Sequence, residues 1–249
     1  MNKVQINYSL PHIIHNNLIN LIKGRSKESY VPKRFPDEVF EHNDNEKEKL
    51  EFEQISINQS CNVNIILNST AIVENSLECI LISPFNSISS DTPKIIKSSL
   101  SVLKSELIKI SSLGRYFDMY QKLYNNKVKN IIEDDELICM NLLFDIRHLI
   151  IHCSVLSAEF IEEDKRGYLY VNDSFYLEIL NNVKKIMNLE NDYYCLPESL
   201  LSWNNLVDQL LINSHKAIVK ITDYSKNILP SVDIPLFYYG IGDFITNKK

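Results

Sequence analysis

The sequence predicts an all-α fold, an up-and-down helical bundle that carries one short extended hairpin. Glycine and proline are scarce, at 5 and 8 of 249 residues, which leaves little material for the many tight turns of an all-β sandwich. Hydrophobic residues make up 45% of the chain, which is enough to bury a large core. Within the predicted helices they recur at spacings of three and four residues, as amphipathic helices require.

Residues 1–60 are expected to form an irregular N-terminal extension, partly loop and partly solvated helix. Pro11, Pro32 and Pro36 interrupt this segment, and residues 41–53 form a charged run with few apolar positions. The predicted core therefore begins after residue 60.

Two helices and an aromatic continuation follow. A dense apolar run predicts a buried helix over 63–82 that Pro84 stops, and Asp91-Thr92-Pro93 opens a second helix over 94–113. Gly114 is expected to break or bend this second helix. The aromatic residues after it repeat every fourth position, which is typical of core residues, although a base-stacking surface would look similar; they are Tyr116, Tyr120 and Tyr124.

The acidic residues 133–135 favour the start of a helix over 135–156, because negative charge stabilises a helix N-terminus. Residues 159–171 predict a hairpin with a charged turn at Gly167, and Asp173 is expected to cap the next helix. A last long helix is expected over 198–224.

These elements divide the chain into three parts: the extension 1–60, a helical bundle over 61–190, and a C-terminal helix with a docked tail over 191–249. The five cysteines are widely spaced without a C-x-x-C pair, which favours reduced core residues over a disulfide frame or a zinc site. The chain start lacks the apolar region of a signal peptide, and no uncharged apolar stretch has the length of a membrane span. We therefore expect a cytoplasmic protein without a membrane partner.

One polar stripe stands out on the predicted helix 135–156. Asn141, Asp145, His148 and His152 follow one another at spacings of four, three and four residues, so they share one face of an otherwise apolar helix. Unpaired polar groups in a core cost about 1–3 kcal/mol each, so the stripe is expected to meet partners, water, a ligand or a second subunit. Arg147 lies beside it, about 140° around the helix axis from His152.

The segment Arg147-His148-Leu149-Ile150-Ile151-His152 resembles the R-x4-6-H motif of the HEPN superfamily, whose members carry it on an α-helical bundle. The resemblance covers about residues 61–190, including Glu74 on the first core helix, the hairpin after the motif and the Asp173 cap. It implies a metal-independent endoribonuclease of a toxin or antiphage defence system, acting as a homodimer through the motif helix, with RNA as substrate and no cofactor. An antitoxin or another defence protein would be a further partner.

The resemblance implies Arg147 and His152 as catalytic residues. Attack of a ribose 2′-OH on the adjacent phosphate needs no metal, His152 would act as general base or acid, and Arg147 would stabilise the charge on the phosphorane. Asp145 or Glu74 would orient the arginine or a histidine, with His148 and Asn141 in supporting positions. The formal net charge of −6 argues against broad RNA binding, so positive potential would have to be local.

Alternatives stay open for these residues. His152 could be a hydrogen-bonded core histidine, Arg147 could form a structural ion pair with Glu74 or Asp145, and the whole could be a catalytically silent RNA- or protein-binding module. A divalent metal held by Asp145, His148 and His152, with a glutamate from the first core helix, is the competing chemistry. We expect no metal, because a second carboxylate-histidine pair is absent from the sequence.

Overall fold

A computed structural model of the protein describes residues 10–25, 46–86, 93–107, 109, 112–151, 156, 158–163, 166–190, 193–230 and 232. Within these residues the chain is mostly helical, which confirms the all-α class, and two strands form a single hairpin. The helices are α1 (Leu10–Gly24), α2 (Glu46–Asn86), α3 (Lys94–Leu107), α4 (Leu113–Tyr124), a 3-10 turn (Val128–Asn130), α5 (Asp134–Ile151), α6 (Ser174–Met187), α7 (Pro197–Ser202) and α8 (Asn204–Ile228).

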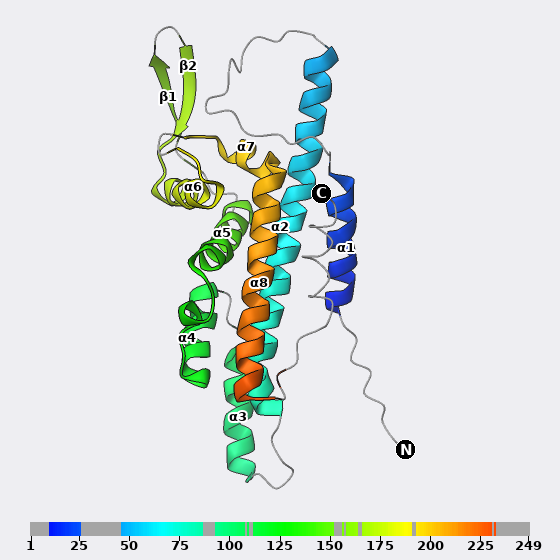
Figure 1. The fold of residues 1–249 in the computed structure, drawn as a ribbon, viewed down its shortest axis with the longest axis vertical. Helices are drawn as coiled ribbons and strands as arrows, with labels where there is room; N and C mark the ends of the chain where they lie inside the picture. The colour runs from blue at the N-terminus through cyan, green and yellow to red at the C-terminus, as the bar shows by residue number, and fades with distance from the viewer. Residues whose placement is uncertain are drawn as a thin grey trace.

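Helices α2 and α8 lie side by side along the length of the molecule (Figure 1). They run in the same direction, because Asn62 contacts Asn204 near the start of α8, whereas α4 bridges the far ends through Ile80 and Ser225. Because α3 to α7 lie between these two helices in the chain, their parallel course does not test the predicted up-and-down order, which stays a prediction. The chain between them passes through α3 to α7 and returns to the end of the molecule at which α2 begins.

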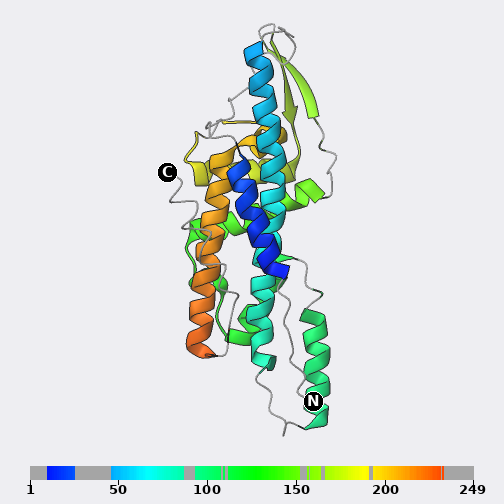
Figure 2. The same ribbon diagram turned by 90° about the vertical axis from the view of Figure 1, so that its right-hand side faces the viewer.

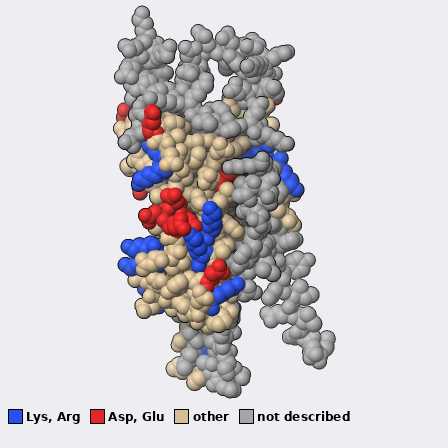
Figure 3. All heavy atoms as spheres, viewed as in Figure 1, with Lys and Arg blue, Asp and Glu red and all other residues tan. Residues whose placement is uncertain are grey.

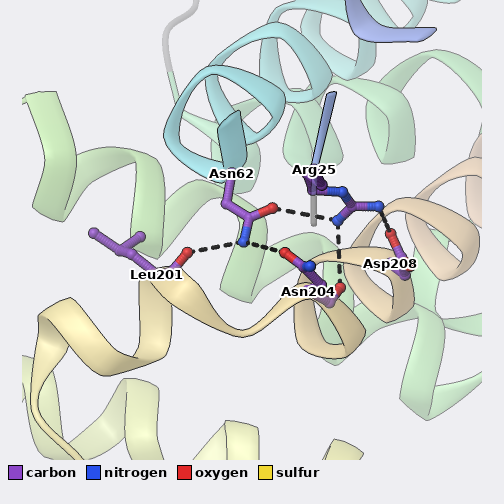
Figure 4. A network of polar contacts seen from close by, with 5 residues as sticks. All are labelled: Arg25, Asn62, Leu201, Asn204 and Asp208. Carbon is purple, nitrogen blue, oxygen red and sulfur yellow. Dashed lines mark hydrogen bonds and ion pairs between the residues drawn. The ribbon is translucent and has the colours of Figure 1, made fainter. Parts of the chain in front are cut away.

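Helix α1 packs along α2 in the opposite direction (Figure 2). Arg25, the residue after its last turn, is buried and joins three elements (Figure 4). Its guanidinium pairs with Asp208 of α8 and donates to Asn62 Oδ1 of α2 at 3.2 Å, while Asn62 Nδ2 donates to Asn204 Oδ1 at 3.0 Å. This network fixes the end of α1 at the junction of α2 and α8.

Helix α5 runs antiparallel to α8 and is anchored at its start. The carboxylate of Glu136 accepts a hydrogen bond from the backbone N–H of Glu133 at 2.9 Å, as in a capping box. Lys220 of α8 reaches both side chains, with Nζ 2.7 Å from Glu133 Oε1 and 2.8 Å from Glu136 Oε1. The acidic residues predicted to open this helix thus also tie it to α8.

Tyr116, Tyr120 and Tyr124 of α4 are core residues, as predicted, and each hydroxyl has a partner on α2 or α8. Tyr124 donates to the carbonyl of Ile80 at 2.8 Å. That carbonyl lies four residues before Pro84, which has no N–H to donate to it. Pro84 therefore lies inside the last turn of α2, because a tyrosine hydroxyl replaces the missing donor. The prediction that Pro84 stops this helix is wrong.

The hairpin consists of β1 (Ala158–Glu163) and β2 (Arg166–Val171), paired antiparallel. Gly167 pairs with Glu162 inside the ladder, so the glycine belongs to β2 and not to the turn. The predicted cap of α6 is confirmed, because Asp173 accepts a hydrogen bond from the backbone N–H of Tyr176 at 3.0 Å.

Several predicted boundaries differ from the structure. Residues 10–24 and 46–60 of the expected irregular extension are helical, the predicted helix 94–113 ends at Leu107, and the predicted helix 198–224 is divided at Trp203 into α7 and α8. The described part of the motif helix ends at Ile151, and most of the tail 229–249 lies outside the described residues.

Helix α2 also bears on the membrane expectation. By length and composition alone, its stretch Glu53–Phe85 would suffice to cross a membrane, which the sequence analysis did not anticipate. More than half of its most apolar window is buried in the protein, and a core helix passes the same test, so this is a weak indication.

The role assigned to Tyr124 predicts a coupling with Pro84. Tyr124→Phe should lower the free energy of unfolding by about 1–2 kcal/mol, because the buried carbonyl of Ile80 loses its donor. In a Pro84→Ala background the loss should be smaller, since the alanine introduced there would supply its own backbone N–H. Denaturant unfolding of the four proteins measures this, and equal losses in both backgrounds would contradict the assignment.

Candidate functional site

Arg147 lies in the last turns of α5 and faces α2. Its Nη1 is 4.0 Å from Glu74 Oε1, and the two side chains are 30% and 22% exposed. A separation of 4.0 Å is longer than a hydrogen bond, so the pair is a loose ion pair. Of the two ion-pair partners proposed for Arg147 from the sequence, the structure therefore shows Glu74.

Glu78 extends this site by one turn of α2. It accepts a hydrogen bond from the Tyr116 hydroxyl at 3.1 Å, so α4 also contributes to the site. Burial raises the pKa of Glu78, and the bond from Tyr116 opposes this effect. From the sequence, Glu78 is the glutamate of the first core helix that could take the place of Glu74 as a metal ligand. Its spacing of four residues from Glu74 is the signal that both share one face of α2.

The charges in this cluster are coupled. Burial raises the pKa of Glu74, the guanidinium of Arg147 opposes the rise, and Glu78 adds to it. Burial, followed by the neighbouring Glu78, raises the pKa of Tyr116. The site thus places one permanent cation beside two half-buried carboxyl groups and a neutral phenol at the meeting point of α2, α4 and α5.

The remaining predicted site residues of α5 lie on its other side, toward α6. Asp145 is half-buried, and burial, with a smaller contribution from Glu178 of α6, raises its pKa to about 6. His148 is exposed and its ring meets Phe175 edge-on, with 5.5 Å between centroids. Asn141 is exposed. Asp145 and Glu74 therefore do not converge on one site, and the carboxylate beside Arg147 is Glu74.

His152, the second predicted catalytic residue, lies outside the described residues, as does Cys153. It follows Ile151, the last residue of α5, so its separation from Arg147 stays a prediction. Among the described residues, no three histidine, cysteine, aspartate or glutamate side chains come together in a group that could hold a metal ion. The split between Asp145 and Glu74 also works against the predicted metal-ligand set.

The distribution of surface charge determines how an anionic ligand could bind. On the face drawn in Figure 3, basic and acidic side chains lie next to one another. The ion pair of Lys220 in α8 with Glu133, just before α5, likewise joins a basic and an acidic side chain. Any phosphate contact on this face would therefore depend on individual cations and not on a broad positive field.

The chain was compared with family models, with curated protein sequences and with solved structures, and none of the three comparisons gave a match. The resemblance to the HEPN superfamily therefore rests on the residues alone.

The loose geometry of Arg147 and Glu74 predicts a small coupling energy. In a double-mutant cycle of Glu74→Gln and Arg147→Gln, the interaction should contribute about 0.5 kcal/mol or less, because both groups are partly solvated. The pair of Arg25 and Asp208, which has a buried guanidinium and a much shorter contact, is the matched control, and its cycle should give a severalfold larger value. A coupling at Arg147 as large as at Arg25 would identify Arg147 as a structural residue.

Asp145 predicts a pH-dependent stability. Its pKa of about 6 lies above the ordinary value of 3.8, so the folded protein binds this proton more tightly than the unfolded chain. Its contribution is therefore fully favourable below about pH 4 and is lost as the pH rises through 6.

Asp145→Asn should accordingly stabilise the protein at pH 7 by on the order of 1 kcal/mol, after allowance for partial exposure, and change little near pH 4. Thermal or denaturant unfolding at both pH values measures the difference. Asp118→Asn, at an exposed position of α4, is the control. An equal effect of Asp145→Asn at both pH values would contradict the assignment.

Proposed function

We propose that the protein is a HEPN-like, metal-independent endoribonuclease, a toxin or antiphage defence effector. The observation that supports this most is the state of Arg147: a partly exposed guanidinium near the end of α5, whose described acidic neighbour lies 4.0 Å away. Its five N–H donors are therefore not consumed by a tight bidentate pair, and a phosphate can compete for them.

The chemistry assigned to the site follows from these groups. Arg147 contacts the non-bridging oxygens of the scissile phosphate and stabilises the charge that develops as the ribose 2′-OH attacks. His152 takes the proton from the 2′-OH or returns one to the leaving 5′-oxygen. Glu74 holds the guanidinium in place without a hydrogen bond, and the products carry a 2′,3′-cyclic phosphate and a 5′-hydroxyl.

A homodimer through the motif helix belongs to the same proposal. The outward side of α5 carries Asn141 and His148, and its last described residue, Ile151, is a large apolar side chain that is 47% exposed. A second copy packed on this side would cover that apolar group and bring two copies of the motif together, with an antitoxin or defence protein as the restraint on activity.

The alternative is a catalytically silent RNA- or protein-binding module. The observation that favours it is the pairing of Arg147 with a carboxylate in a chain of net charge −6, since an adjacent carboxylate opposes a phosphate. In that case Arg147 and His152 contribute to assembly and the protein cleaves no RNA.

Replacement of the arginine tests the proposal. With chelator present, wild-type protein should cleave an RNA oligonucleotide, whereas Arg147→Lys should cleave it about a hundredfold more slowly, because an ammonium cannot copy the guanidinium's paired donors. A gel assay of initial rates measures both.

Arg115→Lys, at an exposed position of α4, is the matched control and should retain the wild-type rate. The unfolding free energies of all three proteins exclude a folding defect. An Arg147→Lys rate equal to that of the control would refute the catalytic role, and a wild type that needs added metal would favour the metal-site alternative.

A further inference from the structure

Helix α3 projects from one end of the bundle. In Figures 1 and 2 it forms the lower tip of the molecule and extends past the end of α8. Its main packing partner is α2. One side of α3 is therefore held by the bundle, and other sides face solvent.

The solvent-facing part of α3 carries an apolar stripe. Ile95 and Val102 are 76% and 60% exposed and lie seven residues apart, which places them on the same face, with the exposed Ser99 between them. They are the two most exposed large apolar side chains in the described part of the chain. The other three lie singly on α2, α5 and α8, which is ordinary for a protein surface; these are Ile57, Ile151 and Ile228.

The same segment is basic in an acidic protein. Residues 93–109 contain four lysines and one glutamate, which give this segment a net charge of +3. Since the whole chain has a net charge of −6, the remaining residues together carry −9. Lys94 and Lys97 are exposed in the first turn of α3, which contains no acidic residue, and Lys109 is exposed just beyond the helix. Cations at a helix N-terminus oppose the helix dipole, so Lys94 and Lys97 do not serve the stability of α3 itself. Lys109, at the other end, pairs with Glu106 at 2.6 Å.

An apolar stripe beside exposed lysines on a projecting helix fits one kind of surface. We infer that α3 binds the surface of an anionic lipid bilayer, with Ile95 and Val102 entering the boundary of headgroups and acyl chains and the lysines contacting the anionic headgroups. RNA would match the lysines but would leave the aliphatic side chains in water, since single-stranded nucleic acid stacks on aromatic residues. A bilayer satisfies both features.

The position of α3 also explains how an acidic protein can approach an anionic surface. Helix α3 lies at the far end of α2 and runs along the same long axis, so a bilayer that takes up both Ile95 and Val102 lies parallel to this axis. Charges in physiological salt are screened over about 8 Å, so acidic side chains that lie farther than this from the bilayer contribute little repulsion. The inference is independent of the proposed ribonuclease activity.

Vesicle binding by the full-length protein tests the inference. Co-sedimentation should show binding to vesicles of phosphatidylcholine with phosphatidylserine, and little binding to phosphatidylcholine alone. The double variant Ile95→Ser/Val102→Ser should lose most of this binding. Lys94→Gln/Lys97→Gln should bind at least about tenfold more weakly, because each lysine near an anionic surface contributes about a factor of five.

The matched control is Ile57→Ser/Ile228→Ser, which removes two exposed isoleucines from α2 and α8 and should bind like the wild type. Failure of the wild type to bind serine-containing vesicles would overturn the inference, as would equal binding by the α3 variants and the control. If the lysine variant instead loses affinity for an RNA oligonucleotide while the apolar variant keeps vesicle binding, α3 is a nucleic-acid contact and the lipid assignment is wrong.

Discussion

Helices α1, α3, α4, α5, α7 and α8 all contact α2, and the arrangement of the molecule follows from the need to cover this one helix. The stretch Glu53–Phe85 of this helix is apolar enough that the helix cannot be solvated on a large face there. Its polar groups must also be satisfied where the covering helices bury them. The side chain of Asn62 forms hydrogen bonds with Arg25 and with Asn204 of α8, and the carbonyl of Ile80 accepts one from Tyr124.

The same requirement creates the candidate site. Glu74 and Glu78 lie on a part of α2 that is only half covered, and the two helices packed there provide the partners, Arg147 from α5 and Tyr116 from α4. The carboxyl groups are desolvated enough to have raised pKa values, yet the guanidinium keeps contact with solvent. A site at the edge of the covered region can keep a cation beside two carboxyl groups through a loose ion pair and still present it to a ligand.

Local signals in the sequence predicted local structure well. The four-residue repeat of the α4 tyrosines indicated a buried face, Asp173 indicated a helix cap, and the charged turn followed by residues 168–171 indicated the hairpin. The signals for α1 were also local, in the spacing of Leu18 and Ile22 and in Gly24 at its end, but the prolines of the segment outweighed them. Pro11 lies in the first turn of α1, where a missing N–H costs nothing.

Long-range pairings could not be predicted in this way. Nothing near Arg25 indicates that its partner is Asp208, 183 positions away, and no local pattern shows that Tyr124 replaces the donor missing at Pro84. The helix period itself separates Asp145 from Arg147 by about 200° around α5, but only the packing shows that Asp145 lies near Glu178 of α6 and Arg147 near Glu74 of α2. The chemical proposal depends on the pair Arg147 and His152, so the most direct measurement compares wild type with a folded His152→Ala variant on total cellular RNA in the presence of chelator. The account predicts fragments with 2′,3′-cyclic phosphate ends from the wild type alone; equal cleavage by both proteins, or none by either, would contradict it.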